Sequence, residues 1–218
     1  MLNGMYDRGV PKLWTETIDA HRTAVRDAAL DAMAALVAEH GLVALTMSQI
    51  AAQTGIGRAT LYKYFPDARA VLTAWHERQI TAHLDQLSAA ADPADPAVVR
   101  LQAVLQTYAH IQRHSAHHHG GELATLLHRS EHVNDAQQRL RDFVQSLIAE
   151  AAQDGDLRDD VAADELASYC LYALAAAGTV AGQDAVHRLV AVTLAGLGAP
   201  ARVSHDRDGR GSVAARTI

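Results

Sequence analysis

Apolar side chains recur every three to four residues along most of this chain, the spacing of amphipathic α-helices. The clearest stripe predicts a first helix over 22–40, with Thr15 as its earliest start and Gly41 directly after its end. No segment shows the strict alternation of a β-strand. Further helices are expected over 46–54, 58–64, 68–91, 96–116, 122–129, 134–153, 162–181 and 184–197. The pattern therefore predicts an all-α fold.

Residues 47–66 have the internal order of a helix-turn-helix. Thr46 is placed to cap the first helix of the pair, and Gln49, three residues later, completes a capping box. Gly55 occupies the turn, where glycine adopts a left-handed backbone without steric cost. The apolar wedge that fixes the angle between the helices is expected to be Ile50, Ile56 and Leu61.

The second helix of this pair leaves a polar set on its outer side. Cations, a hydroxyl and a phenol suit phosphate oxygens and base edges. The candidate DNA-binding residues are Thr46, Gly57, Arg58, Ala59, Thr60, Tyr62 and Lys63. Arg58, in the first turn, is expected to reach a base edge, whereas Thr46, Tyr62 and Lys63 are expected to hold phosphates. A plain packing corner is the alternative, but cap, turn, wedge and polar set agree within one stretch.

This stretch resembles the TetR family of bacterial repressors. Residues 45–56 are similar to the family's capped second helix and turn. Residues 58–65 are similar to its recognition helix, including the Thr-Leu-Tyr run and the terminal aromatic-Phe pair. Gly57 departs from a frequent capping serine, and Ala68 departs from a frequent lysine that would contact phosphate. The resemblance covers about residues 22–75.

The resemblance implies a domain organisation for the chain. We expect an N-terminal extension or arm over 1–21 and the helix-turn-helix domain over 22–67. A helical effector-binding and dimerisation domain is expected over 68–198, with a disordered tail over 199–218. The implied protein is a homodimeric regulator, most readily a repressor that a small molecule of unknown identity releases from palindromic operator DNA.

The net charge of −6 argues weakly against a nucleic-acid binder, so its distribution matters. Residues 1–72 hold seven Lys or Arg and seven Asp or Glu, so the negative balance lies in 73–218. Phosphate binding in the first part must therefore come from the local placement of cations, since no bulk positive field exists there.

Two patterns in the C-terminal part concern ligand and partner. Aromatic residues make up only 5% of the chain, and four of them are candidates for an effector cavity, with plain core packing as the alternative. These four are Trp75, Tyr108, Phe143 and Tyr172. Small and apolar residues on the last two helices predict the surface on which two chains pair. They are Leu166, Tyr169, Ala173, Ala176, Ala177, Val186, Leu189, Val190, Thr193, Leu194 and Leu197.

Seven of the thirteen histidines lie between His110 and His132, several at the helical spacing of metal ligands. A solvated polar patch is the simpler interpretation, because no carboxylate–histidine signature accompanies them, and we predict neither a metal nor a cofactor. The common hydrolase, zinc-protease and P-loop motifs are absent from the sequence, so no enzyme is expected. Two alternatives stay open: a His-rich metal-dependent enzyme, and a DNA-binding dimer without any ligand.

The uncharged stretch over 166–182 contains hydroxyl groups and small residues and is too short for a bilayer span. A single cysteine, Cys170, rules out a disulfide within the chain and lies in an apolar stretch that should leave it inert. We therefore expect a cytoplasmic protein with no membrane partner.

Overall fold

The computed structural model describes residues 12–41, 45–118 and 131–198, except for the side chains at 12–18, 117–118 and 131–132. Within these ranges the regular elements are helices and no strand is present, so the all-α prediction is confirmed. The elements are α1 (Lys12–His40), α2 (Met47–Thr54), α3 (Arg58–Leu61), α4 (Ala68–Ala90), α5 (Ala97–His118), α7 (Glu131–Gln153), α8 (Ala163–Ala175), the 3₁₀ turn η1 (Ala176–Gly178) and α9 (Gln183–Ala195).

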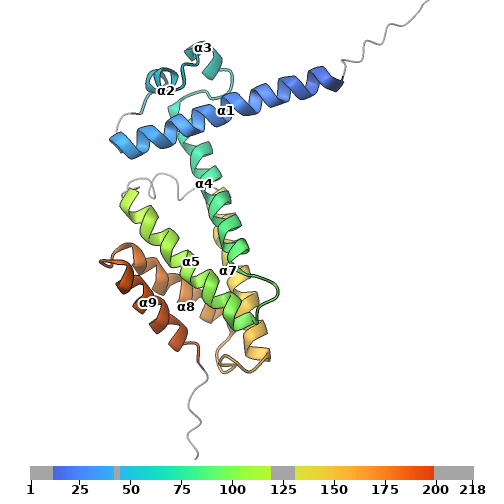
Figure 1. Ribbon diagram of the computed structural model, residues 1–218, viewed down its shortest axis with the longest axis vertical. Coiled ribbons are helices and arrows are strands. Elements are labelled where there is room, and N and C mark those ends of the chain that lie inside the picture. Colours follow the sequence, from blue (N-terminus) through green and yellow to red (C-terminus); the bar gives the residue numbers. More distant parts are fainter. Residues whose placement is uncertain (1–11, 42–44, 119–130, 199–218) are drawn as a thin grey trace, which may run out of the picture.

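The N-terminal core lies between α1, α2, α3 and the first turns of α4 (Figure 1). The apolar stripe of α1 is buried at the spacing read from the sequence, and Met33 has no exposed surface. Ile50 and Leu61 are also fully buried, while Ile56 is half-buried against the same core. The wedge predicted between the two helices of the helix-turn-helix is therefore present.

α4 connects this core to a second one. Its first turns bury Val71 and Trp75 in the N-terminal core, and its last turns bury Leu87 in the C-terminal core. Figure 1 shows it running without a break from the helix-turn-helix down into the helical bundle. The side chain of Asp67 caps its start, because Oδ1 accepts a hydrogen bond from the N–H of Ala70 at 2.8 Å.

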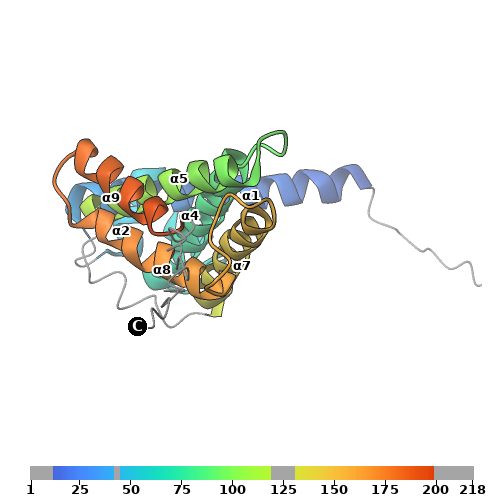
Figure 2. The same ribbon diagram turned by 90° about the horizontal axis from the view of Figure 1, so that it is seen from below.

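The C-terminal core is built by α5, α7, α8 and α9, which lie side by side when the molecule is seen from below (Figure 2). Leu101, Leu105, Ile148 and Leu174 are fully buried at its centre. At Gly178, α8 and η1 approach α5 so closely that a Cβ atom would lie 2.7 Å from the Cβ of Ala116. None of the described helices is long and apolar enough to span a bilayer.

Several expected element boundaries differ from the structure. α1 begins at Lys12, so the helix continues through the second half of the segment expected as an arm. α3 ends at Leu61 rather than Tyr64 and is followed by turns. The helix expected over 162–181 is α8 followed by the 3₁₀ turn. The helix expected over 122–129 and the tail over 199–218 lie outside the described residues.

The surface expected for pairing of two chains is wrong at most of its positions. Six of its residues are buried in the chain's own core, namely Leu166, Ala177, Val186, Val190, Thr193 and Leu197. Helical periodicity identified the face of α8 and α9 that is buried, but α5 and α7 of the same chain cover that face. Large apolar side chains that remain exposed on these two helices are Tyr169, Tyr172 and Val192.

Candidate nucleic-acid interface and ligand pocket

The start of α2 is fixed by the predicted capping box. The hydroxyl of Thr46 accepts a hydrogen bond from the N–H of Gln49 at 3.3 Å, and Oε1 of Gln49 accepts one from the N–H of Thr46 at 2.8 Å. Both bonds satisfy donors that an α-helix leaves unpaired at its start. The local sequence therefore determines where α2 begins and which way its first turn faces.

The turn between α2 and α3 requires glycine at one position. Gly55 has φ 71° and ψ 4°, and its N–H donates to the carbonyl of Ala51 at 2.9 Å. The hydroxyl of Thr54 accepts from the N–H of Ile56 at 3.1 Å, which ties the turn to the preceding helix. At the next position, Gly57 caps α3 with ordinary extended backbone angles and contributes no side-chain hydrogen bond.

The seven candidate DNA-binding residues occupy the outer side of this unit. Arg58, Ala59, Tyr62 and Lys63 are exposed, whereas Leu61 between them is fully buried. Thr46 and Gly57 are exposed as well, and Thr60 is half-buried. Buried and exposed positions on and after α3 thus separate as the sequence analysis expected, and the contact of these residues with DNA stays a prediction.

Two neighbours of this surface were missed by sequence reasoning. Ser48 on α2 accepts a hydrogen bond from Nη1 of Arg58 at 3.4 Å, which links the two helices on their exposed side. The guanidinium of Arg26, on α1, lies 5.0 Å from the ring centre of Phe65, a cation–π contact. Neither contact has a local sequence signal, because each joins residues ten or more positions apart.

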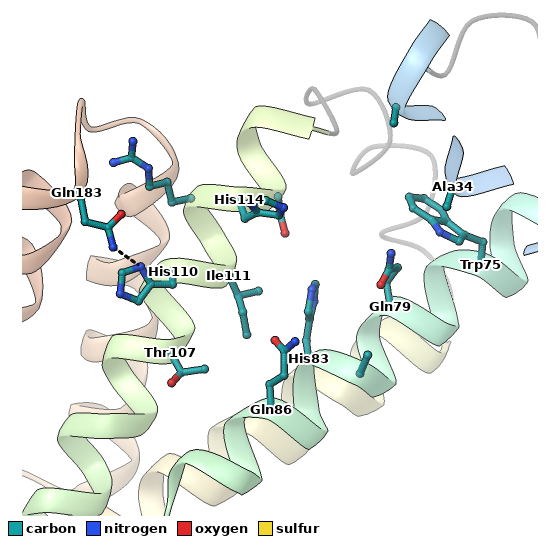
Figure 3. Close-up of a pocket in the computed structure, with 14 residues that line it drawn as sticks. Ala34, Trp75, Gln79, His83, Gln86, Thr107, His110, Ile111, His114 and Gln183 are labelled. Atoms are coloured by element: carbon teal, nitrogen blue, oxygen red, sulfur yellow. Dashed lines mark hydrogen bonds between the residues drawn. The ribbon is translucent and has the colours of Figure 1, made fainter. Parts of the chain in front are cut away.

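A large pocket of about 850 Å³ lies between α1, α4 and α5. Figure 3 shows Gln79, His83 and Gln86 projecting from α4 into the gap that Ile111 faces from α5. Its volume is within the range of small-molecule sites. Trp75 and the alanines of α1 lie at one end, and the first residue of α9 lies at the other.

At the α9 end of the pocket, His110 of α5 contacts two residues of α9. Its Nδ1 lies 3.1 Å from Nε2 of Gln183, and its ring meets that of His187 edge-on at 5.8 Å between centres. When the Gln183 amide donates to Nδ1, the proton of neutral His110 is on Nε2. The polar lining is therefore braced by contacts between α5 and α9.

The four aromatic residues proposed for an effector cavity do not gather around one pocket. Trp75 lines the large pocket, whereas Phe143 lines a separate hollow of about 240 Å³ between α4 and α7. Tyr108 is half-buried, its hydroxyl accepts from Nε2 of Gln112 at 2.5 Å, and burial raises its pKa. Tyr172 is 76% exposed on α8. Trp75 alone of the four lies beside the large pocket.

The polar pocket residues on α4 had a signal in the sequence that was overlooked. Gln79, His83 and Gln86 follow Trp75 at steps of three and four, so they continue the helix face that Trp75 buries. Polar side chains in line with a buried face need hydrogen-bond partners or water, which a cavity supplies here. The partner residues on α1 and α5 have no such signal, because their positions depend on tertiary packing.

Some of the clustered histidines line the large pocket, but the described ones do not form a metal site. His83, His110 and His114 line the pocket. No group of three or more His, Cys, Asp or Glu suited to hold a metal ion occurs among the described residues. The side chains of His117, His118 and His132, and all of His119 and His128, lie outside that part of the chain.

In comparison with known proteins, the N-terminal and the C-terminal part of the chain each match a family of transcriptional regulators. Residues 29–74 match the family model described as bacterial regulatory proteins, tetR family. Residues 101–199 match the model described as the C-terminal domain of SbtR-like transcriptional regulators. None of the curated proteins matches the chain at a significant level.

Three solved structures with this fold are similar along nearly their whole length. A TetR/AcrR-family regulator from Thermobifida fusca YX-ER1 is 22% identical with a TM-score of 0.64, over 81% of this chain and 98% of its own. RolR in complex with resorcinol is 18% identical with a TM-score of 0.54, over 83% and 91%. AibR in complex with isovaleryl coenzyme A and operator DNA is 18% identical with a TM-score of 0.56, over 79% and 97%.

Proposed function

Because this chain belongs to the TetR family of DNA-binding transcriptional regulators, we propose that it is a homodimeric repressor that a small molecule releases from its operator. The exposed side of α3 and of the turn that follows it, with Arg58 and Lys63, reads the operator. The effector site is the pocket between α1, α4 and α5. RolR with resorcinol and AibR with a coenzyme A ester and operator DNA support such a pairing of ligand and DNA in this fold.

The observation that carries this proposal is the position of α4. One uninterrupted helix contains the capped start beside α3, the pocket residues Trp75 to Gln86, and a residue of the bundle core, Leu87. A ligand that contacts the pocket therefore touches the helix that positions the helix-turn-helix. Rigid elements of this kind carry coupling between two sites when both sites bias the same two arrangements.

The required coupling is modest. A ligand shifts the population only by its differential affinity for the DNA-competent and DNA-incompetent arrangements. A hundredfold difference corresponds to about 2.7 kcal/mol, which is within the usual range for allosteric proteins. A few polar contacts to α4 that form in one arrangement only are sufficient for this.

Pairing of two chains is assigned to the exposed apolar residues of the last helices. Tyr169 and Tyr172 on α8 and Val192 on α9 are 43%, 76% and 66% exposed. Large apolar side chains gathered on neighbouring helices favour burial against a second copy. A two-fold dimer presents two α3 helices to successive major grooves, so the operator is expected to be a near-palindrome.

The test is binding of the full-length protein to a fluorescent DNA fragment from upstream of its own gene, followed by anisotropy. We expect salt-sensitive binding by the wild-type chain and by Gln137→Ala, a control at an exposed residue of α7. Tyr172→Asp is expected to give monomers in light scattering and weak binding. Binding that needs no dimer, or that no pocket ligand weakens, would contradict the proposal and favour a DNA-binding protein without ligand control.

A further inference from the structure

Carboxylates and cations of the N-terminal unit differ in how they are paired. Residues 19–72 contain five of each kind, which gives no net charge. Each of the five carboxylates contacts a cation, a histidine or the start of a helix. Asp19 pairs with Arg22, Asp27 and Asp31 lie within 4.0 Å of Arg78, Glu39 lies beside His40, and Asp67 caps α4.

Most of the cations in this range have no such partner. Four of the five have no carboxylate within ion-pair distance among the described residues, and all four are exposed. They are Arg26, Arg58, Lys63 and Arg69. The unit therefore has positive charge available for phosphate although its overall balance is zero, because its carboxylates are engaged elsewhere.

Arg26 of α1 lies close to the predicted phosphate-binding end of the helix-turn-helix. Its guanidinium is 5.0 Å from the ring centre of Phe65, which follows Lys63 by two residues. Two residues of chain span at most about 7 Å, so Arg26 lies near the turn that contains Lys63. Asp27, the next residue of α1, instead faces Arg78 on α4. Figure 1 shows α1 lying along α2 and α3.

The contact with Phe65 leaves the hydrogen-bonding edge of Arg26 available. A guanidinium that meets an aromatic ring does so through its charge and its face, whereas its five N–H donors lie around its edge. Within the described ranges Arg26 has no ion pair, and the ring of Phe65 is its recorded contact. Phosphate oxygens accept hydrogen bonds, and those from arginine are among the strong ones in proteins.

From these observations we infer that Arg26 binds a DNA backbone phosphate next to the one held by Lys63. α1 is then part of the nucleic-acid interface, and the ring of Phe65 holds the guanidinium in place. A phosphate contact adds affinity and fixes the position of the protein on the duplex without reading sequence. This inference deepens the proposed function and rests on it, since α3 and the turn after it are taken as the side that faces DNA.

The experiment is an anisotropy titration of the full-length protein, over a range of salt concentrations, with DNA from upstream of its own gene and with an unrelated fragment of equal length. Arg26→Gln should weaken binding to both fragments by the same factor, about tenfold or more for a dimer at about 0.1 M salt. The salt slope should fall by about one per subunit. Arg26→Lys retains the charge and should keep the slope. Arg139→Gln, which removes an exposed arginine of α7, should bind as the wild type does.

A second measurement uses the wild-type chain alone. Phenylglyoxal modifies exposed arginines, and mass spectrometry of peptides reports each position with and without bound DNA. We expect DNA to protect Arg26 as well as Arg58, while Arg139 on α7 reacts equally in both samples. An Arg26 that stays reactive when Arg58 is protected would overturn the inference.

The salt series distinguishes a phosphate contact from a packing role. If Arg26 only covers Phe65, Arg26→Gln lowers affinity without changing the salt slope, and the inference is wrong. Failure of the proposed function gives a different result. An unchanged slope in Arg26→Gln together with a reduced slope in Lys63→Ala overturns the inference and leaves DNA reading by the helix-turn-helix standing. Protection of Arg26 without protection of Arg58 supports the inference and contradicts the role proposed for α3.

Discussion

Nη2 of Arg78 lies 2.7 Å from Oδ1 of Asp31 and so joins the middle of α4 to α1. The other guanidinium nitrogen, Nη1, lies 4.0 Å from Oδ1 of Asp27, one turn earlier on α1. Gln79, the next residue on α4, lines the large pocket. The ion pair thus sits at the junction of the two cores, on the helix that connects pocket and DNA-binding surface.

This ion pair is expected to contribute little to stability. The Asp31 side chain is 72% exposed and that of Arg78 is 36% exposed, so solvent screens their attraction. In a double-mutant cycle of Arg78→Met and Asp31→Asn, followed by urea unfolding, we expect a coupling energy below about 1 kcal/mol. The coupling should shrink further in high salt. A salt-independent coupling of several kcal/mol would mean that the pair is shielded from solvent.

The two glycines of the turn are expected to respond oppositely to serine. A Cβ at Gly57 or Gly55 meets no atom within 4 Å, so neither substitution has a steric cost from neighbours. Gly57 has φ −60° and no side-chain cap, so Gly57→Ser adds a capping oxygen and should stabilise by a few tenths of a kcal/mol up to about 1 kcal/mol. Gly55 has φ 71°, so Gly55→Ser should destabilise by about 1–3 kcal/mol.

Thermal unfolding of both variants, monitored by circular dichroism, checks this pair. Each serves as the control for the other, because the substitution is identical and the positions are two residues apart. A gain at Gly55, or a loss at Gly57 larger than at Gly55, would show that the backbone angles of the turn differ from those described.

At Gly178, by contrast, neighbouring atoms rather than the backbone angles exclude a larger residue. A methyl group there would lie 2.7 Å from the Cβ of Ala116 and 3.3 Å from the carbonyl oxygen of Gln112. Gly178→Ala should therefore force α8 and η1 away from α5, at a cost of about 1–3 kcal/mol in unfolding experiments. The double variant Gly178→Ala with Ala116→Gly should recover part of that loss. No recovery would show that the backbone of α5, rather than Ala116, sets the limit.

Local signals explain what the sequence predicted well. The capping box of Thr46 and Gln49 and the turn at Gly55 are formed by residues within five positions of one another, so their hydrogen bonds follow from the local sequence. The wedge of Ile50 and Leu61 follows from helical periodicity. Together these local features were enough to predict the helix-turn-helix and the side of α3 that is exposed.

Tertiary packing explains what the sequence did not predict. Periodicity showed that Val186 and Val190 are buried, but it could not show that the chain's own helices bury them. Likewise, Tyr172 was predicted to line a cavity because it is one of few aromatic residues, but it lies on the surface. The pocket depends on how α1, α4 and α5 meet, which no single segment specifies.

Cys170 is expected to remain a protonated, unreactive thiol in the native protein. Burial raises its pKa to about 12, well above the roughly 8.5 of a free thiol. The folded state therefore resists ionisation, and stability falls as pH rises above the unfolded pKa, by at most about 1.4 kcal/mol per pH unit. Urea unfolding between neutral and alkaline pH should show this decline relative to Cys170→Ala. Rapid alkylation of native protein would contradict it.

The most direct test of the central claim is whether α3 reads DNA. Arg58 and Lys63 are both exposed on this side of the molecule, and they are assigned to a base edge and to phosphate respectively. Anisotropy titrations of the preferred operator, over a range of salt concentrations, distinguish the two roles. Arg58→Ala should cost about 1–3 kcal/mol and relax base preference at one position per half-site. Lys63→Ala should weaken binding to all sequences alike and reduce the salt slope by about one per subunit. Operator affinity unchanged in the combined variant would contradict the account.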